Sequence, residues 1–236
     1  MPPADHPVPG PRDVSRWLSA PRYGRYLAVA EGDHRRALDL YLWNARAAAA
    51  VLVDVGHVEV ALRNSYDREL SRVFPNWATD HHSPAFQRTQ GVERARHAQR
   101  QSNERNLAQL RRVWPGTSGR LNHDRVVAAL PFGFWASLTA RHREMVFWTP
   151  MLHRAFPHGT RRADVHRLVE HIVALRNRLA HNEPVFTTRT GLSRRMAEVD
   201  DLLNLISPAI ARYVGARSTV RAALAECPID GLLDVR

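Results

Sequence analysis

The sequence predicts an all-α protein built as a bundle of about six to eight helices. Apolar residues recur at three- and four-residue intervals in several long segments, which is the spacing of one face of a helix. No run of alternating apolar and polar residues is long enough to indicate a strand. Prolines and glycines divide the periodic segments, and these divisions set the expected number of helices.

Residues 1–12 (MPPADHPVPGPR) are rich in proline, which lacks an amide donor and disfavours helix in the residue before it. We expect this segment to be a disordered arm. A short helix follows from Asp13, and a second helical piece carries Tyr23 and Tyr26. A single helical domain is predicted over residues 13–226, with a C-terminal tail at 227–236.

The next segment predicts a long helix that begins at Gly32-Asp33 and ends before Pro75, with a possible break at Gly56. Residues 75–88 are polar and turn-rich, which indicates a loop. Residues 115–124 predict another loop.

Between these loops lies a basic and weakly apolar segment at 91–114, which predicts an exposed helix. It is the best candidate for a surface that follows phosphates, although a solvated helix would have the same composition. Its arginines are Arg94, Arg96, Arg100, Arg105, Arg111 and Arg112.

Residues 131–148 concentrate aromatic side chains, which favours core packing over stacking on bases, as it does for Trp43. Residues 162–184 hold the clearest amphipathic helix. A last helical region at 192–215 has a boundary or kink at Pro208. The stripe of the amphipathic helix consists of Val165, Leu168, Ile172, Leu175 and Leu179.

The chain has 236 residues, a formal net charge of +11 and a pI near 11.2. This charge favours a polyanionic partner such as nucleic acid, and all 34 basic residues are arginine, which a GC-rich coding bias also produces. A Walker-type phosphate-binding loop, a pyridoxal phosphate Schiff base and a Ser-Lys nucleophile pair each need lysine, so the sequence excludes all three.

The single cysteine, Cys227, cannot form an internal disulfide, so a cytoplasmic location is expected. The longest apolar run, at 47–53, is far shorter than the roughly 20 residues of a membrane span, and no secretory signal opens the chain. We therefore expect no association with membrane. His81 and His82 lack a second pair at ligand spacing, so no zinc site is predicted.

Four blocks carry a resemblance to a known family. They are LYLWNARAAAAVLVDVGHVEVALRN at 40–64, VVAALPFGFWASL at 126–138, RAFP at 154–157 and LRNRLAHNEP at 175–184. In order and content they resemble the Abi-like (abortive infection) proteins, a branch of the HEPN superfamily. The resemblance spans residues 23 to 215 and implies a HEPN-like helical fold.

The resemblance implies that Arg176, Asn177 and His181 are catalytic residues of an endoribonuclease. A ribose 2′-hydroxyl can attack the adjacent phosphate once a base removes its proton, and an imidazole suits that role or the role of the acid. A guanidinium fork can hold two phosphate oxygens in the transition state. This chemistry needs no metal and no cofactor.

The resemblance also implies that RNA is the partner and that two copies form a homodimer with a composite site. The cellular role would be growth arrest or phage defence, restrained by an antitoxin protein or a small RNA. Candidates for RNA-binding or supporting roles are Glu59, Arg63, Asn64 and Arg178.

A regular helix separates Arg176 from His181 by about 7.5 Å of rise and about 140° of rotation, so the two do not share a face. Asn177 and His181 do share one. The alternative function is a non-catalytic helical module that binds RNA or protein. In that case Arg176 and Arg178 would be solvated, and His181 would interact with the helix dipole before Pro184 ends the helix.

Overall fold

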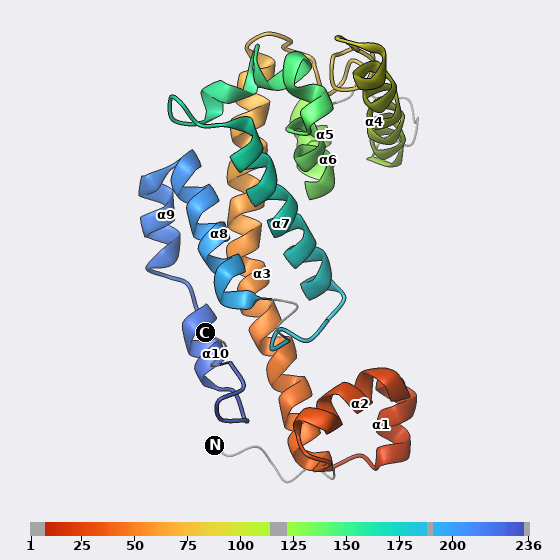
Figure 1. Ribbon diagram of the computed structural model, residues 1–236, viewed down its shortest axis with the longest axis vertical. Helices are drawn as coiled ribbons and strands as arrows, with labels where there is room; N and C mark the ends of the chain where they lie inside the picture. The colour runs from red at the N-terminus through yellow and green to blue at the C-terminus, as the bar shows by residue number, and fades with distance from the viewer. Residues whose placement is uncertain (1–7, 114–121, 188–190, 234–236) are drawn as a thin grey trace. The chain divides into compact units, whose positions relative to one another are not determined.

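The computed structural model describes residues 8–113, 122–187 and 191–233 (Figure 1). All regular secondary structure in these residues is helical, which confirms the all-α prediction. The helices are α1 (Pro11–Leu18), α2 (Ala20–Val29), α3 (His34–Ser71), α4 (Glu93–Val113), α5 (His123–Ala129), α6 (Phe132–Leu138), α7 (Arg162–Ala180), α8 (Leu192–Ile206), α9 (Pro208–Gly215) and α10 (Val220–Ala225).

The described residues thus form ten α-helices, more than the six to eight expected, because prolines and glycines divide the terminal regions into short helices. Short 3-10 and π turns, η1 (Arg141–Arg143), η2 (Glu144–Trp148) and η3 (Leu152–Ala155), connect α6 to α7. None of the helices within 8–113, 122–187 and 191–233 combines the length and the apolar character needed to cross a membrane.

The chain forms two compact units. The first comprises residues up to 52, 178–192 and those from 218 onward, and the second comprises 53–177 and 193–217. Both α3 and α7 contribute residues to each unit. The division of the sequence into a single domain at 13–226 and a tail at 227–236 stays a prediction.

The N-terminal arm is shorter than expected, because α1 already begins at Pro11. Proline fits the first helical position, where the missing amide donor would have no partner in the helix and the fixed φ angle is already helical. Residues 1–7 of the predicted arm lie outside the described part of the chain, and so does most of the predicted loop at 115–124.

Helix α3 runs for 38 residues. It starts where the sequence predicted, and Asp33 caps it by accepting a hydrogen bond from the amide of Arg36 at 3.0 Å. The expected break at Gly56 is wrong, since α3 is continuous there. A single interior glycine costs about 1 kcal/mol relative to alanine, and the burial of Val55 and Val58 on either side offsets that cost.

In the first unit, Asn44 of α3 fixes the chain that follows α7. Its fully buried side-chain oxygen accepts a hydrogen bond from the amide of Val185 at 2.7 Å. Its amide nitrogen donates to the carbonyl of Glu183 at 3.4 Å and to the side-chain oxygen of Asn182 at 3.5 Å. Beside it, the indole of Trp43 donates to the carbonyl of Ala223 at 2.8 Å, which ties α10 to α3.

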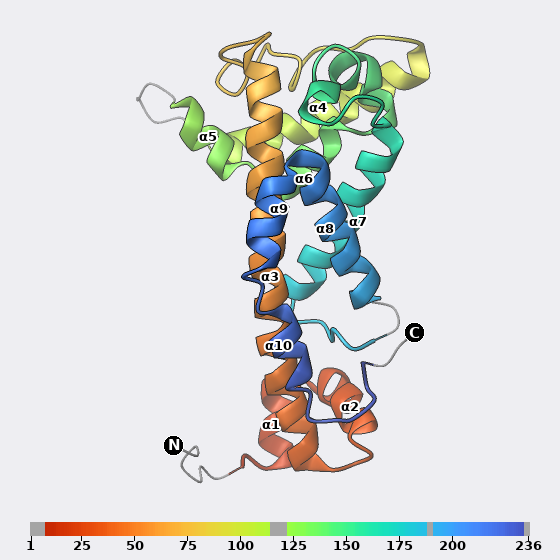
Figure 2. The same cartoon turned by 90° about the vertical axis from the view of Figure 1, so that its left-hand side faces the viewer.

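The second unit gathers α7, α8 and α9 along the part of α3 that begins at residue 53 (Figures 1 and 2). Its aromatic cluster contains Trp77, Phe134 and Trp135, with Trp77 stacked on Phe134 at 5.9 Å between ring centroids. All three rings are buried, as is Trp43 in the first unit. The prediction of core packing is confirmed, and these rings are not available to stack on bases.

Helix α4 is more firmly packed than its composition suggested. Its buried face consists of Leu110 and three amide side chains, which donate hydrogen bonds to carbonyls of the preceding loop and of η1. Asn106 donates to the carbonyl of Ala85 at 2.9 Å, and Gln99 donates to the carbonyls of Gln90 and His142 at 2.9 and 2.6 Å. Hydrogen bonds, rather than an apolar stripe, therefore hold this helix in place.

The predicted apolar stripe of α7 is confirmed, because Val165, Leu168, Ile172, Leu175 and Leu179 are all buried. The boundary expected at Pro208 is also confirmed. Helix α8 ends at Ile206, and the hydroxyl of Ser207 accepts a hydrogen bond from the amide of Ile210 at 3.4 Å to cap α9.

A buried carboxylate joins α7 to α8. The side chain of Glu198, 6% exposed, receives Arg195 at 2.6 Å and His171 at 2.8 Å. Arg167 lies 3.3 Å and Arg194 3.6 Å from the same carboxylate. Burial by itself would raise the pKa of Glu198, but the hydrogen bonds from His171 and Arg195 and the charges of both outweigh it and hold the pKa below its usual value.

We expect replacement of Asn44 by leucine to lower the free energy of unfolding by about 2–4 kcal/mol, because the buried amide of Val185 loses its acceptor. The matched control is Asn64→Leu, which changes an exposed asparagine of the same helix and should shift stability by less than about 0.5 kcal/mol. Urea unfolding followed by circular dichroism measures both. Equal effects would contradict a structural role for Asn44.

Glu198→Gln should lower stability by about 2–3 kcal/mol near pH 7, because three arginines and the imidazole of His171 lose a charged acceptor. Since the folded-state pKa of Glu198 lies below its unfolded value, its contribution is present above about pH 4.3 and is lost as the pH falls through the folded pKa. Urea unfolding should be measured at pH 7 and at a pH below the folded-state pKa of Glu198. The difference in unfolding free energy between wild type and variant should disappear at the lower pH. A difference that does not change with pH would refute this assignment.

Candidate functional site

The segment LRNRLAHNEP lies at the C-terminal end of α7, and its last residues form a helix-terminating turn. The amide of Glu183 donates to the carbonyl of Arg178 at 3.0 Å, and the amide of Asn182 donates to the carbonyl of Leu179 at 2.9 Å. Asn182 has a φ of 53°, the left-handed conformation that such a turn requires and that asparagine tolerates better than most residues. Pro184 follows directly, where a helix could not continue.

The first unit holds this turn from several sides. Arg22 of α2 donates to the carbonyl of His181 at 3.1 Å, and the side-chain nitrogen Nδ2 of Asn182 donates to the hydroxyl of Tyr41 at 3.3 Å. Arg178 forms an ion pair with Glu183 at 3.0 Å. Arg178 is therefore held within the turn, although the sequence marked it as a candidate for RNA binding.

Arg176 and Asn177 are exposed on the last turns of α7 in the second unit. The guanidinium of Arg176 donates to the side-chain oxygen of Asn177 at 3.5 Å, a long hydrogen bond. Neither side chain is buried in the core. Both can therefore contact a ligand that approaches from solvent.

Glu59 of α3 is half-buried and lies within the electrostatic reach of Arg176. Burial raises the pKa of the Glu59 carboxyl, and the charges of Arg176 and Arg63 oppose that shift. This interaction brings two of the predicted residues together in one unit. A carboxyl group with a raised pKa beside a cation can exchange protons with a bound substrate.

The remaining supporting candidates lie one turn further along α3. Arg63 donates to the carbonyl of Ala128 at 3.2 Å and to the side-chain oxygen of Asn64 at 3.4 Å. Arg63 thus fastens the end of α5 to α3, while the side chain of Asn64 is exposed.

His181 is exposed and occupies the first position after α7, in the first unit. The helix is regular up to Ala180, so it does not loosen between Arg176 and the turn. Arg176 and His181 therefore belong to different units.

The residues that the structure describes contain no cluster of three or more His, Cys, Asp or Glu side chains placed to hold a metal ion. The rings of His81 and His82 lie 4.3 Å apart in the loop before α4.

Sequence reasoning missed two groups of polar residues. One is the set of cations around Glu198, which the spacing of Arg194, Arg195 and Glu198 on one helix face would have indicated. The other is a cavity between α4 and η1, where Arg94 and His142 come from distant parts of the sequence. No local pattern signals the second group.

Comparisons of the chain with protein-family models, with curated proteins and with solved structures each find no match.

The turn at Asn182 predicts an unusual order of stabilities. Asn182→Gly should be more stable than Asn182→Ala by about 1 kcal/mol in the free energy of unfolding, and should therefore unfold at a higher temperature. The reason is that only glycine adopts the left-handed conformation without strain. At the exposed Ala174 in the interior of α7, glycine should instead be worse than the native alanine by about 1 kcal/mol. Thermal unfolding of the variants tests both orders, and a less stable Asn182→Gly would refute the turn.

Proposed function

We propose that the protein is a metal-independent endoribonuclease of the kind implied by its resemblance to the Abi-like HEPN proteins. The observation that supports this proposal is the exposure of Arg176, Asn177 and His181 at the end of α7. Each of these side chains can contact a phosphodiester that approaches from solvent.

The reaction is an attack of the ribose 2′-hydroxyl on the adjacent phosphorus. A bond forms between the 2′-oxygen and phosphorus while the bond from phosphorus to the 5′-oxygen breaks. A base takes the proton of the 2′-hydroxyl, and an acid gives a proton to the departing 5′-oxygen. The products are a 2′,3′-cyclic phosphate and a 5′-hydroxyl.

Each motif residue has a distinct task in this reaction. The guanidinium of Arg176 binds two phosphate oxygens as negative charge builds on them. His181 transfers a proton, and Asn177 orients the reacting groups by hydrogen bonding. Glu59 supports Arg176 through its charge, and its raised pKa also suits a second proton-transfer group.

We propose that two copies form a homodimer in which the ends of both α7 helices face one substrate. This arrangement would supply the acid and the base as two imidazoles from different copies. The cellular role would be growth arrest or phage defence in the cytoplasm, with an antitoxin protein or a small RNA restraining the enzyme.

We expect Arg176→Ala and His181→Ala each to lower the rate of RNA cleavage by about 10²–10⁴-fold, because each removes one group that acts in the transition state. Arg176→Lys should recover only part of the activity, since an ammonium cannot bind two oxygens at once. Purified protein, total RNA and gel analysis in EDTA measure this effect, and EDTA itself should not slow cleavage.

Arg161→Ala and His158→Ala are the matched controls, because both residues are exposed and lie outside the motif. Their cleavage rates should equal that of the wild type. Intact RNA with the wild type at every protein concentration would refute the nuclease.

A non-catalytic RNA-binding module is the second candidate, and one observation favours it. The HNEP part of the motif already has a structural explanation in the turn that ends α7. RNA that is bound but never cut by the wild type would identify this alternative.

A further inference from the structure

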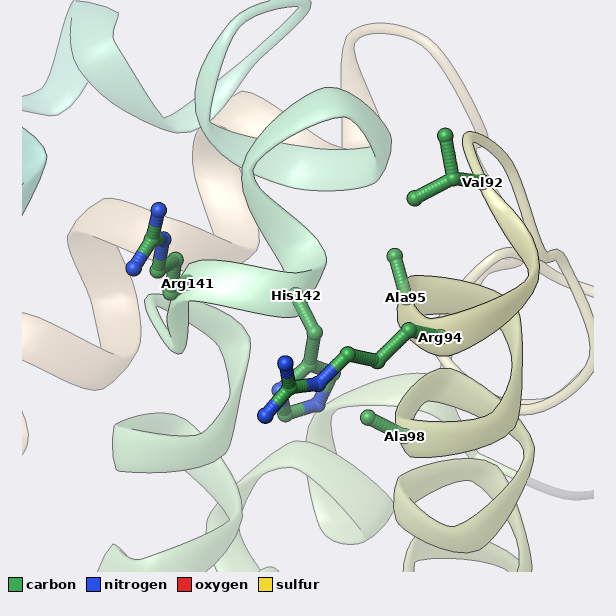
Figure 3. A pocket seen from close by; sticks show the side chains of 6 residues that line it. All are labelled: Val92, Arg94, Ala95, Ala98, Arg141 and His142. Atoms are coloured by element: carbon green, nitrogen blue, oxygen red, sulfur yellow. The ribbon is translucent and has the colours of Figure 1, made fainter.

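A cavity of about 470 Å³ lies between α4 and η1 in the second unit, away from the end of α7. Its lining contains three cationic or titratable side chains and three apolar ones, and no acidic residue: Val92, Arg94, Ala95, Ala98, Arg141 and His142. In Figure 3, Arg94 reaches from α4 toward His142, whereas the guanidinium of Arg141 extends away from α4. The α4 side of the cavity therefore supplies a cation together with small apolar side chains, and η1 supplies an imidazole toward which the cation reaches.

Hydrogen bonds fix both walls of this cavity. The hydroxyl of Ser102 on α4 lies 2.7 Å from Nε2 of His142, and Gln99 donates to the carbonyl of the same residue at 2.6 Å. The walls are thus held together by two contacts between α4 and η1. A ligand would enter a preformed site rather than create one.

The surroundings of the cavity are positively charged. Burial lowers the pKa of His142, and the charges of Arg143, His166 and Arg105 lower it further. Arg143 is fully buried, and two of its guanidinium nitrogens lack a hydrogen-bond partner among the described residues. The charged groups that shift the pKa of His142 are all basic, so the potential at this imidazole is positive, which favours an anionic ligand.

The same face of α4 carries further unpaired cations beyond the cavity. Along a regular helix, Arg105 lies about 20° around the axis from Arg94, and Arg112 lies at about 0°, at distances of about 16 and 27 Å along the axis. All three are exposed, and none forms an ion pair within the part of the chain that the structure describes. We call Arg94, Arg105 and Arg112 the α4 stripe.

The acidic residues of α4 lie on other faces. Glu93 is paired with Arg100 at 2.8 Å, and both lie about 100–120° around the helix from Arg94. Glu104 lies about 80° from it. The stripe is therefore a row of cations on one face, which fits a chain of phosphates better than a single small anion.

We propose that the α4 stripe and the cavity beside it bind the phosphodiester backbone of single-stranded RNA, with one phosphate seated between Arg94 and His142. The apolar wall formed by Val92, Ala95 and Ala98 then contacts the ribose of that nucleotide. This inference rests on the proposed function, because it assigns the surface that holds the RNA substrate of that site.

The test measures binding of a fluorescein-labelled oligouridine by fluorescence anisotropy over a series of sodium chloride concentrations. The full-length chain carries His181→Ala, so that the probe is not cut. Arg94→Gln with Arg105→Gln should weaken binding and reduce the slope of log Kd against log salt by about 1.4, since each phosphate contact with a single strand contributes about 0.7.

Arg96→Gln with Arg111→Gln is the matched control, because it removes the same charge from other faces of the same helix. It should leave the slope unchanged. Circular dichroism of both double variants verifies that α4 remains folded. Equal loss of slope in the two double variants would overturn the stripe, as would uridine monophosphate binding as tightly as the oligonucleotide.

The outcomes separate this inference from the proposed function. Cleavage by the wild type together with an unchanged slope in the stripe variant refutes the stripe and leaves the nuclease standing. Binding that depends on the stripe without any cleavage refutes the nuclease and supports the RNA-binding module. The absence of both binding and cleavage refutes both proposals.

Discussion

The structure depends on one constraint, which is the burial of a single long stripe on α3. This helix supplies Leu40, Trp43 and Val51 to the core of the first unit and Val58 and Leu62 to that of the second. A helix of 38 residues exposed to water on all sides would not persist from its propensity alone, and its interior glycine weakens it further. The apolar surface that both units bury against α3 stabilises it, so each unit needs α3 to complete its core.

Buried polar side chains then determine how the other helices pack within each unit. Asn44 fixes the chain after α7, amide side chains of α4 donate to carbonyls of the preceding loop and of η1, and Glu198 joins α7 to α8. Such contacts are directional, and a buried polar group without its partner costs about 1–3 kcal/mol. They therefore specify single arrangements of helices that apolar packing would leave less well defined.

The residues at the end of α7 have a structural role in the turn and a proposed role in catalysis. Asn182 and Pro184 end the helix, and the contacts of Arg22 and Arg178 hold the turn in place. This rigidity is what a catalytic constellation needs, because reacting groups must be held in position by their surroundings. A turn that fixes the backbone at the end of α7 would serve the proposed nuclease.

The sequence by itself determined the helical class, the course of α3 and α7 and the burial of the aromatic residues, because these follow from apolar spacing and from the positions of proline and glycine. It also singled out Arg176 and His181. Only the tertiary structure decided three features. Gly56 does not interrupt α3, amide side chains are buried on the inner face of α4, and Arg94 and His142 line one cavity. Those features depend on partners that lie outside the same helix, 21 residues apart for Asn106 and Ala85 and 43 for Gln99 and His142, or on packing that outweighs local propensity, and no local pattern encodes either.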